Sequence, residues 1–243
     1  MYKQLILGAA VSLALASGVV LAKDVPADLG EKLKPLFGGA PDSLKATPLD
    51  GLFEAKFGGD ILYVSSDGRY IMTGEMIDAE TRVSLTEQSR STDRKELVNT
   101  IDAGKTVEFK AKGEEKHVLY AFTDVDCPFC VKLHREVPAL NEQGVTVRYL
   151  AYPRAGVGSP AYKKMVNVWC AEDKQDAMTK VKNGEEIAAK DCENPVAADF
   201  DLGRKLGVNG TPALLTTDGM MIPGYRPADQ LVKMLDSAKT AAN

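Results

Sequence analysis

The pattern of apolar and polar positions divides the chain into two modules. In the first, short runs of alternating hydrophobicity between glycine-containing turns predict an antiparallel meander with strands at residues 52–57, 60–65 and 69–73. Residues 29–37 have the spacing of a short helix, which Gly38 would end. A module of about sixty residues has a thin core, so pairing with a second copy through a sheet edge would stabilise it.

A polar segment follows this module. Few apolar residues occur between residues 83 and 104, which predicts a linker. We expect it to become helical from about Ser91 or Thr92, where a capping oxygen precedes Lys95 and Glu96. A surface helix that belongs to either module is the alternative.

From residue 105 onward the pattern predicts the order strand, strand, helix, strand, helices, strand, strand, helix. Apolar runs at residues 118–122 and 145–152 are typical of buried strands. Between them, apolar residues at intervals of three and four predict a helix with one inward face: Cys130, Leu133, Val137 and Leu140. Further helices are expected at residues 162–171, 173–182, 195–206 and from Pro227 to about residue 239, with a hairpin of residues 213–217 and 220–224 before the last one.

The first 22 residues have the pattern of a secretory signal peptide. Lys3 supplies the positive end, residues 5–15 the apolar centre, and Ala22 the small residue for cleavage before Lys23. The mature chain is therefore expected to work outside the cytoplasm, where disulfides persist. The residue directly after the cleavage position is not a cysteine, so no lipoprotein anchor is expected. Glycine and serine residues dilute the apolar stretch, so no stable membrane anchor is expected either.

Composition limits the class of protein and its partners further. With 44% hydrophobic and 26% charged residues the chain is ordinarily globular. A formal net charge of -4 supplies no basic patch, which argues against a nucleic-acid partner. All four cysteines follow residue 126, so the two modules are expected to have different tasks.

The stretch Cys127-Pro128-Phe129-Cys130 joins a predicted strand to the start of a predicted helix. The unpaired N–H groups and positive end of that helix favour the thiolate of Cys127. We expect Cys127 to be the more exposed sulfur and the nucleophile, and Cys130 to lie nearer the core and resolve a mixed disulfide. The spacing predicts a redox dithiol.

A zinc site and an inert structural disulfide are the alternatives for this dithiol. Tetrahedral zinc usually needs a second closely spaced pair of Cys or His ligands, which the chain lacks, so no metal is expected. Cys170 and Cys192 are most simply a structural disulfide, worth about 3 kcal/mol in the chain-entropy model, with a second redox pair as the alternative. His134 is expected to be solvent-exposed and His117 structural, although either could relay protons to the dithiol.

Several strings carry a resemblance to a known family. Strand, Cys-x-x-Cys helix and a late Thr211-Pro212 before a hairpin resemble a thioredoxin fold. Residues 115–118, 122–124, 132–134, 146–151, 169–171 and 206–213 resemble the DsbC/DsbG family of periplasmic thiol:disulfide interchange proteins, over most of the mature chain. Thioredoxin itself has a buried acid where this chain has Ala121, so no carboxylate proton acceptor carries over.

The resemblance implies an α+β chain with a signal peptide at residues 1–22 and a cystatin-like antiparallel dimerisation domain at residues 23–82. A linker helix at residues 83–104 and a thioredoxin-like α/β domain with a helical insertion at residues 105–243 would follow. It also implies a V-shaped homodimer, and Thr211 before a cis Pro212 opposite the dithiol. A cis bond would free the Thr211 backbone to pair with an extended client, whereas a trans proline that starts a strand is the alternative.

The implied activity is isomerisation of non-native disulfides in misoxidised secreted proteins, with no cofactor and with the inner-membrane protein DsbD as reductant. One departure leaves the balance of activities open: the dipeptide between the cysteines is Pro128-Phe129, where isomerases of the family often carry Gly-Tyr and the DsbG branch Pro-Tyr. A DsbG-like reductase of single oxidised cysteines, a dimeric holdase chaperone and a monomeric oxidase are the alternatives.

Overall fold

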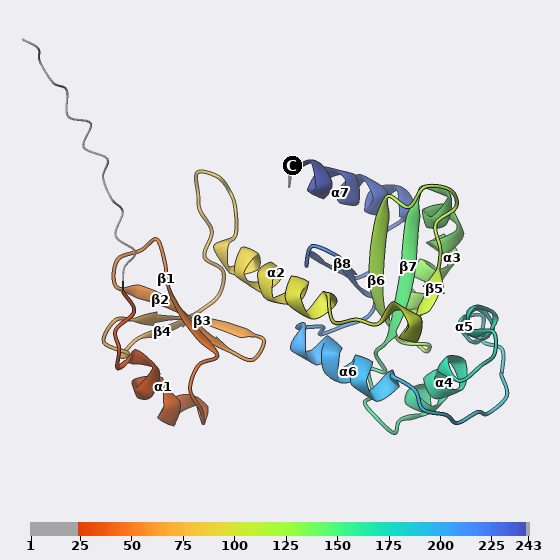
Figure 1. Cartoon of the computed structure of the whole chain (residues 1–243), viewed down its shortest axis with the longest axis horizontal. Coiled ribbons are helices and arrows are strands. Elements are labelled where there is room, and N and C mark those ends of the chain that lie inside the picture. Colours follow the sequence, from red (N-terminus) through yellow and green to blue (C-terminus); the bar gives the residue numbers. More distant parts are fainter. Residues whose placement is uncertain (1–23, 242–243) are drawn as a thin grey trace, which may run out of the picture.

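The structure, a computed structural model, describes residues 24–241, and the predicted signal peptide lies outside these residues. Two sheet-containing domains lie at either end of helix α2, which spans Leu85–Val98 (Figure 1). None of the helices within residues 24–241 combines the length and apolar character needed to cross a lipid bilayer.

The N-terminal domain packs one helix against an antiparallel sheet. Helix α1 (Leu29–Phe37) ends at Gly38, whose left-handed φ of 73° favours glycine, as predicted. A four-stranded sheet in the order β1-β2-β3-β4 follows: β1 (Ser43–Ala46), β2 (Leu52–Phe57), β3 (Asp60–Ser65) and β4 (Ile71–Thr73). The meander is confirmed, but β1 was not predicted, because Ser43-Leu44-Lys45-Ala46 is short and contains only one large apolar side chain.

The two faces of this sheet have different partners. Leu29 and Leu33 of α1 pack with Phe53, Ala55 and Val64 in a small core, as the predicted inner face of β2 requires. On the other face, the buried Glu54 and Lys56 bind α2 through Ser89 and Asp93. Polar contacts thus hold the first turns of α2 to the N-terminal sheet.

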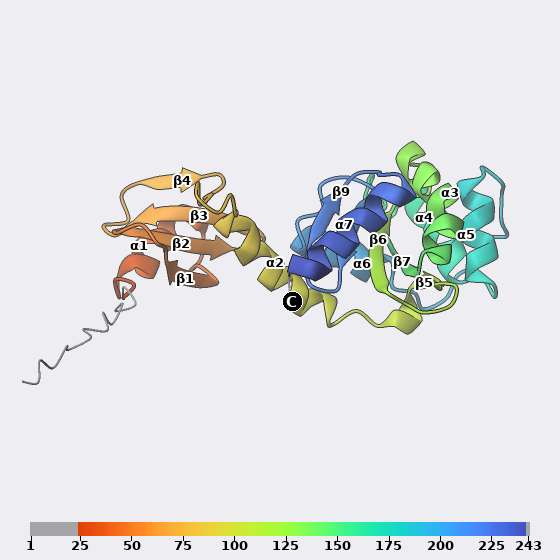
Figure 2. The same cartoon turned by 90° about the horizontal axis from the view of Figure 1, so that it is seen from above.

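Helix α2 begins about two turns earlier than predicted. The Ser84 hydroxyl accepts a hydrogen bond from the Glu87 backbone N–H at 3.0 Å, so Ser84 is the N-cap in place of Ser91 or Thr92. Ser91 instead donates to the Asp218 carbonyl oxygen, and Arg94 to that of Leu206. The helix therefore contacts both domains (Figure 2).

The C-terminal domain is a five-stranded sheet in the order β5-β7-β6-β8-β9. Strands β6 and β7 pair in parallel and the other neighbours are antiparallel. The strands are β5 (Val107–Phe109), β6 (His117–Thr123), β7 (Val145–Ala151), β8 (Ala213–Thr216) and β9 (Met221–Pro223). The helices are η1 (Ala103–Lys105), α3 (Pro128–Glu142), α4 (Pro160–Trp169), α5 (Lys174–Lys182), α6 (Val196–Lys205) and α7 (Ala228–Ala241). The predicted order of elements is confirmed.

Alternating residues of β6 divide the core of this domain between the two sheet faces. Leu119 and Ala121 belong to the larger cluster, with side chains of α3, α4, α5 and α7. Tyr120 and Phe122 belong to the smaller cluster, which includes Leu206 after α6. An added Cβ on Gly203 of α6 would lie 2.6 Å from the Tyr152 ring, so this glycine allows α6 to approach the sheet closely.

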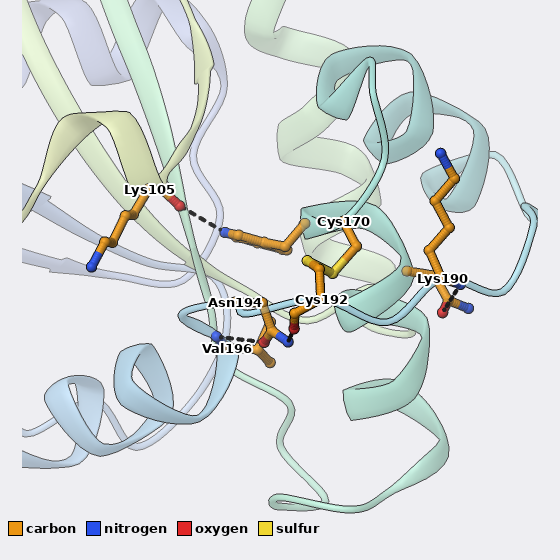
Figure 3. The surroundings of a disulfide bond; sticks show 8 residues. Lys105, Cys170, Lys190, Cys192, Asn194 and Val196 are labelled. Atoms are coloured by element: carbon orange, nitrogen blue, oxygen red, sulfur yellow. Dashed lines mark hydrogen bonds between the residues drawn. A yellow bond between two sulfur atoms is a disulfide. The ribbon is translucent and has the colours of Figure 1, made fainter.

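A disulfide joins Cys170, at the end of α4, to Cys192, in the segment between α5 and α6 (Figure 3). Asn194 donates from Nδ2 to the Cys192 carbonyl oxygen and accepts from the Val196 backbone N–H. The neighbouring Trp169 donates from its indole to the Lys105 carbonyl oxygen at 2.9 Å. The disulfide thus ties the segment between α5 and α6 to the end of α4.

Candidate active site

The dithiol lies where β6 leaves the sheet and α3 begins. Cys127 is the N-cap of α3, and Pro128 occupies the first helical position, where its missing N–H costs nothing. Asp124 shapes the turn: its Oδ1 accepts from the Asp126 backbone N–H at 2.8 Å, and its carbonyl oxygen accepts from the Cys127 N–H at 3.2 Å. The local sequence thus fixes Cys127 at the positive end of α3.

The two sulfurs are free thiols with pKa values shifted in opposite directions. Burial works against ionisation of Cys127, but the nearby Thr211 side chain and the backbone N–H groups of Cys130 and Phe129 favour the thiolate, outweigh burial and lower the pKa. Burial raises the pKa of Cys130, with a partial opposing effect from Lys182. Cys127 therefore ionises first and Cys130 keeps its proton.

Cys127 was expected to be the more exposed of the two sulfurs, and the structure buries both residues almost completely. The accessible surface of Cys127 is only 1% of the maximum, because the Thr211 carbonyl oxygen lies 3.2 Å from Sγ and covers it. Pro128 and Phe129 are the exposed residues of the motif, Phe129 at 54%, and the Phe129 ring centroid lies 5.2 Å from Lys132 Nζ. The structure thus presents an aromatic ring beside a covered sulfur.

Thr211 and Pro212 lie against the dithiol, and the peptide bond between them is cis, as predicted. Thr211 Oγ1 is buried and has no hydrogen-bond partner within residues 24–241. Its position beside the sulfurs lowers the pKa of both Cys127 and Cys130. This hydroxyl is therefore placed to donate to a thiolate once one forms.

His134 is buried, contrary to the prediction that it is solvent-exposed. Its Nδ1 lies 3.0 Å from the Tyr149 hydroxyl and its Nε2 lies 3.1 Å from Thr179 Oγ1. Burial and then the charge of Lys182 lower its pKa to about 4, so it is neutral near pH 7. His117 begins β6, at the opposite end of that strand from the dithiol, and its Nε2 lies 2.8 Å from Asp236.

The sequence analysis missed Lys182 as part of this site. The ammonium of Lys182, on the last residue of α5, reaches Thr123 and the Asp124 carbonyl oxygen. The Asp124 carboxylate accepts from the backbone and side chain of Arg154. Nothing in the local sequence of α5 marks Lys182, because its burial depends on packing against the end of β6.

In residues 24–241, no three His, Cys, Asp or Glu side chains come together in an arrangement that could hold a metal ion.

Comparison with known proteins agrees with this geometry. A family model described as "Thioredoxin-like domain" matches residues 105–239, and one described as "Disulfide bond isomerase protein N-terminal domain" matches residues 20–87. The chain is 35% identical to "Thiol:disulfide interchange protein DsbC" of Dickeya dadantii (strain 3937), over 99% of this chain and 98% of the relative. It belongs to the DsbC family of thiol:disulfide interchange proteins.

Other DsbC-family members extend this similarity. "Thiol:disulfide interchange protein DsbC" of Escherichia coli (strain K12) is 37% identical, over 79% of this chain and 80% of the relative. A solved structure, "Crystal structure of disulfide interchange protein from Neisseria gonorrhoeae", aligns with a TM-score of 0.50 and 32% identity, covering 56% of this chain and 97% of that one. Like other members of the family, the chain is a thiol-disulfide oxidoreductase with a thioredoxin-like domain.

Proposed function

We propose that the chain is a periplasmic isomerase that rearranges non-native disulfides in secreted proteins, with Cys127 as nucleophile and Cys130 as resolving thiol. The observation that carries this proposal is the opposite direction of their pKa shifts, lowered for Cys127 and raised for Cys130. A thiolate can attack at neutral pH while its neighbour stays a thiol, which gives the mixed disulfide time to rearrange.

In the first step, the Cys127 thiolate attacks one sulfur of a client disulfide. A bond forms between Cys127 Sγ and that sulfur, the client disulfide breaks, and the other client sulfur leaves as a thiolate. Either another client thiolate then attacks and releases reduced Cys127 with a new client pairing, or Cys130 attacks Cys127 Sγ. The second route leaves the client reduced and the enzyme oxidised, so it requires a reductant, for which we propose DsbD.

Thr211 and Pro212 are proposed to hold the client. The Thr211 carbonyl oxygen lies 3.2 Å from Cys127 Sγ, so an extended client segment that pairs with this backbone would lie next to the sulfur. Pro128 and Phe129 would form part of the same surface and tune the reactivity of the thiols. The exposed Phe129 ring gives an apolar contact for a partly unfolded client.

We propose that two copies act together as a homodimer in the periplasm. Residues 1–22 would be the signal peptide, 23–82 the dimerisation domain, 83–104 the linker and 105–243 the catalytic domain. Strand β4 at the edge of the N-terminal sheet supports the dimer, since it leaves Ile71 and Met72 exposed on an unpaired edge. All the relatives compared above that carry the DsbC name match this chain across both domains.

Refolding of a secreted protein with scrambled disulfides tests the function. We expect the parent to restore native pairings, Cys127→Ser to restore none above background, and Cys130→Ser to accumulate mixed disulfides with the client. Recovery of native pairings by Cys127→Ser at the parent rate would contradict the proposal. A parent that reduces a sulfenic acid on a folded protein but fails to unscramble disulfides would instead be a DsbG-like reductase.

A further inference from the structure

Among the residues that the structure describes, Lys182 is a buried cation whose hydrogen bonds involve no carboxylate. Its side chain is on a residue only 3% exposed, and Nζ donates to Thr123 Oγ1 at 2.7 Å and to the Asp124 carbonyl oxygen at 2.8 Å. Burial of an ammonium without a carboxylate bonded to it costs several kcal/mol in free energy. An apolar side chain would suit a purely structural role better.

The Thr123 hydroxyl connects Lys182 to the dithiol. Thr123 is the last residue of β6, and its hydroxyl accepts a hydrogen bond from Lys182 Nζ. The same side chain favours the thiolate of Cys130 and so acts to lower the pKa of that thiol against the effect of burial. The charge of Lys182 acts on Cys130 in the same direction, and the Cys130 thiolate in turn raises the pKa of Lys182. Three separate elements, β6, α3 and α5, thus bring a thiol, a hydroxyl and an amine into one cluster.

We propose that Thr123 and Lys182 are the relay that removes the proton from Cys130 when this thiol attacks the mixed disulfide on Cys127. This inference rests on the proposed role of Cys130 as the resolving thiol. Ala121 leaves the site without the buried carboxylic acid that would otherwise accept this proton at its position in the strand. Lys182 supplies a base from the helical insertion instead.

The relay conserves atoms and charge. The Cys130 thiol donates its proton to Thr123 Oγ1 while the Thr123 hydroxyl passes its own proton to the neutral Lys182 amine. The sulfur that forms attacks Cys127 Sγ, the Cys127–Cys130 disulfide forms, and the client sulfur leaves as a thiolate. Lys182 ends as an ammonium held by the Asp124 carbonyl oxygen, and it returns the proton along the same route when the disulfide is reduced.

The surroundings of Lys182 bring its pKa close enough to neutral pH that both the ammonium and the neutral amine occur. Burial lowers its pKa to about 8, against the opposing effects of Cys130, Asp124, Cys127 and Asp126. Roughly a tenth of the amines would thus be neutral at pH 7. The carboxylate groups are partly compensated by other cations, Asp124 by Arg154 and Asp126 by Lys164.

The two other titratable groups below the dithiol do not ionise in this range. His134 has its pKa lowered to about 4, first by burial and then by Lys182. Tyr149 has its pKa raised, first by burial and then by Cys130. Near neutral pH, only the sulfurs and Lys182 exchange protons in this cluster.

Single-turnover kinetics with glutathione disulfide tests the relay in the full chain. Acid quenching and mass spectrometry would follow glutathionylated Cys127 as it forms and as Cys130 displaces glutathione, between pH 5 and 9. We expect Lys182→Met and Thr123→Val each to form the intermediate within about twofold of the parent rate. In both variants, displacement of glutathione by Cys130 should slow at least tenfold at pH 7, and the pH midpoint of that step should move upward.

Lys180→Met is the matched control, because Lys180 lies on the same helix with its ammonium in an exposed ion pair with Asp176. In Lys180→Met, Cys130 should displace glutathione at the parent rate. Parent-like rates and midpoints in both Lys182→Met and Thr123→Val would overturn the relay, as would slowing in Lys182→Met alone. Cys130→Ser separates the two proposals: if glutathione leaves Cys127 equally fast without Cys130, the resolving role itself fails.

Discussion

Cys127 Sγ lies 3.2 Å from the carbonyl oxygen of Thr211, a residue 84 positions later in the chain. This contact joins the start of α3 to the loop before β8 and covers the reactive sulfur. The same residue places a buried hydroxyl without a partner in the described chain beside both thiols. The backbone of Thr211 therefore covers the Cys127 sulfur, and its side chain favours the thiolate.

Substitution Thr211→Val should slow the reaction of Cys127 with iodoacetamide at pH 6 by about tenfold, because a hydrogen bond to a charged group is worth about 1.5 kcal/mol or more. Valine keeps the shape of threonine and removes Oγ1 alone. Thr217→Val, in the exposed turn after β8, is the control and should react like the parent. Equal rates for Thr211→Val and the parent would show that Oγ1 does not assist the thiolate.

Removal of the second cysteine pair should affect stability and leave the thiol chemistry intact. In a Cys127→Ser/Cys130→Ser background, the further change Cys170→Ala/Cys192→Ala is expected to lower the free energy of unfolding by about 3 kcal/mol. Urea unfolding measures this. In the background with the active cysteines restored, iodoacetamide should still react with Cys127 as in the parent. An unchanged unfolding free energy would contradict a stabilising role for this disulfide.

Met72→Lys should weaken association of two copies. Met72 is 48% exposed on β4, the edge strand of the N-terminal sheet, where a charged side chain opposes pairing with another edge. We expect the dissociation constant measured by sedimentation to rise at least tenfold. Leu49→Lys is the control, since Leu49 is an exposed apolar residue at 56% that lies in the turn before β2. Equal association in Met72→Lys and the parent would place the dimer contact elsewhere.

Asp199→Asn should change how stability depends on pH. Burial raises the pKa of Asp199 to about 7, against a partial opposing effect of the hydrogen bond from the Ala151 N–H. Between about pH 4 and pH 7 the folded chain holds a proton that the unfolded chain releases, so this group lowers stability as pH rises through that window. Asparagine accepts the same hydrogen bond and never ionises.

The Asp199→Asn chain should therefore exceed the parent by on the order of 2 kcal/mol in free energy of unfolding at pH 8 and match it at pH 4. Urea unfolding at the two pH values measures this. Asp201→Asn on the exposed side of α6 is the control and should follow the parent at both. A parent-like difference between pH 4 and 8 in Asp199→Asn would contradict the pKa assigned to Asp199.

Local signals in the sequence predicted the part of the site built from neighbouring residues. An apolar strand, a turn and a helix-periodic segment placed Cys127 at the N-terminus of α3, and the Thr211-Pro212 pair in this context indicated a cis bond. Helix α2 was placed too late although Ser84 and Glu87 form a capping pattern, because the polar surface of this helix carries little hydrophobic periodicity.

The sequence pattern could not predict features that depend on contacts between residues far apart in the chain. Lys182 and Thr123 are 59 residues apart, and only the packing of α5 against the end of β6 buries the ammonium. His134 lies on the predicted helix, yet its burial depends on Tyr149 of β7 and Thr179 of α5. The cover over Cys127 likewise comes from the Thr211 loop, so exposure could not be inferred from the helix alone.

The central claim is that Cys127 is held as a thiolate at the start of α3 while Cys130 stays protonated. Alkylation of the reduced parent with iodoacetamide across pH 4 to 10, with both cysteine peptides quantified by mass spectrometry, tests it most directly. We predict that Cys127 becomes reactive well below the pH at which free cysteine does, and Cys130 above it. Reaction of Cys127 at or above the pH typical of free cysteine would contradict the account.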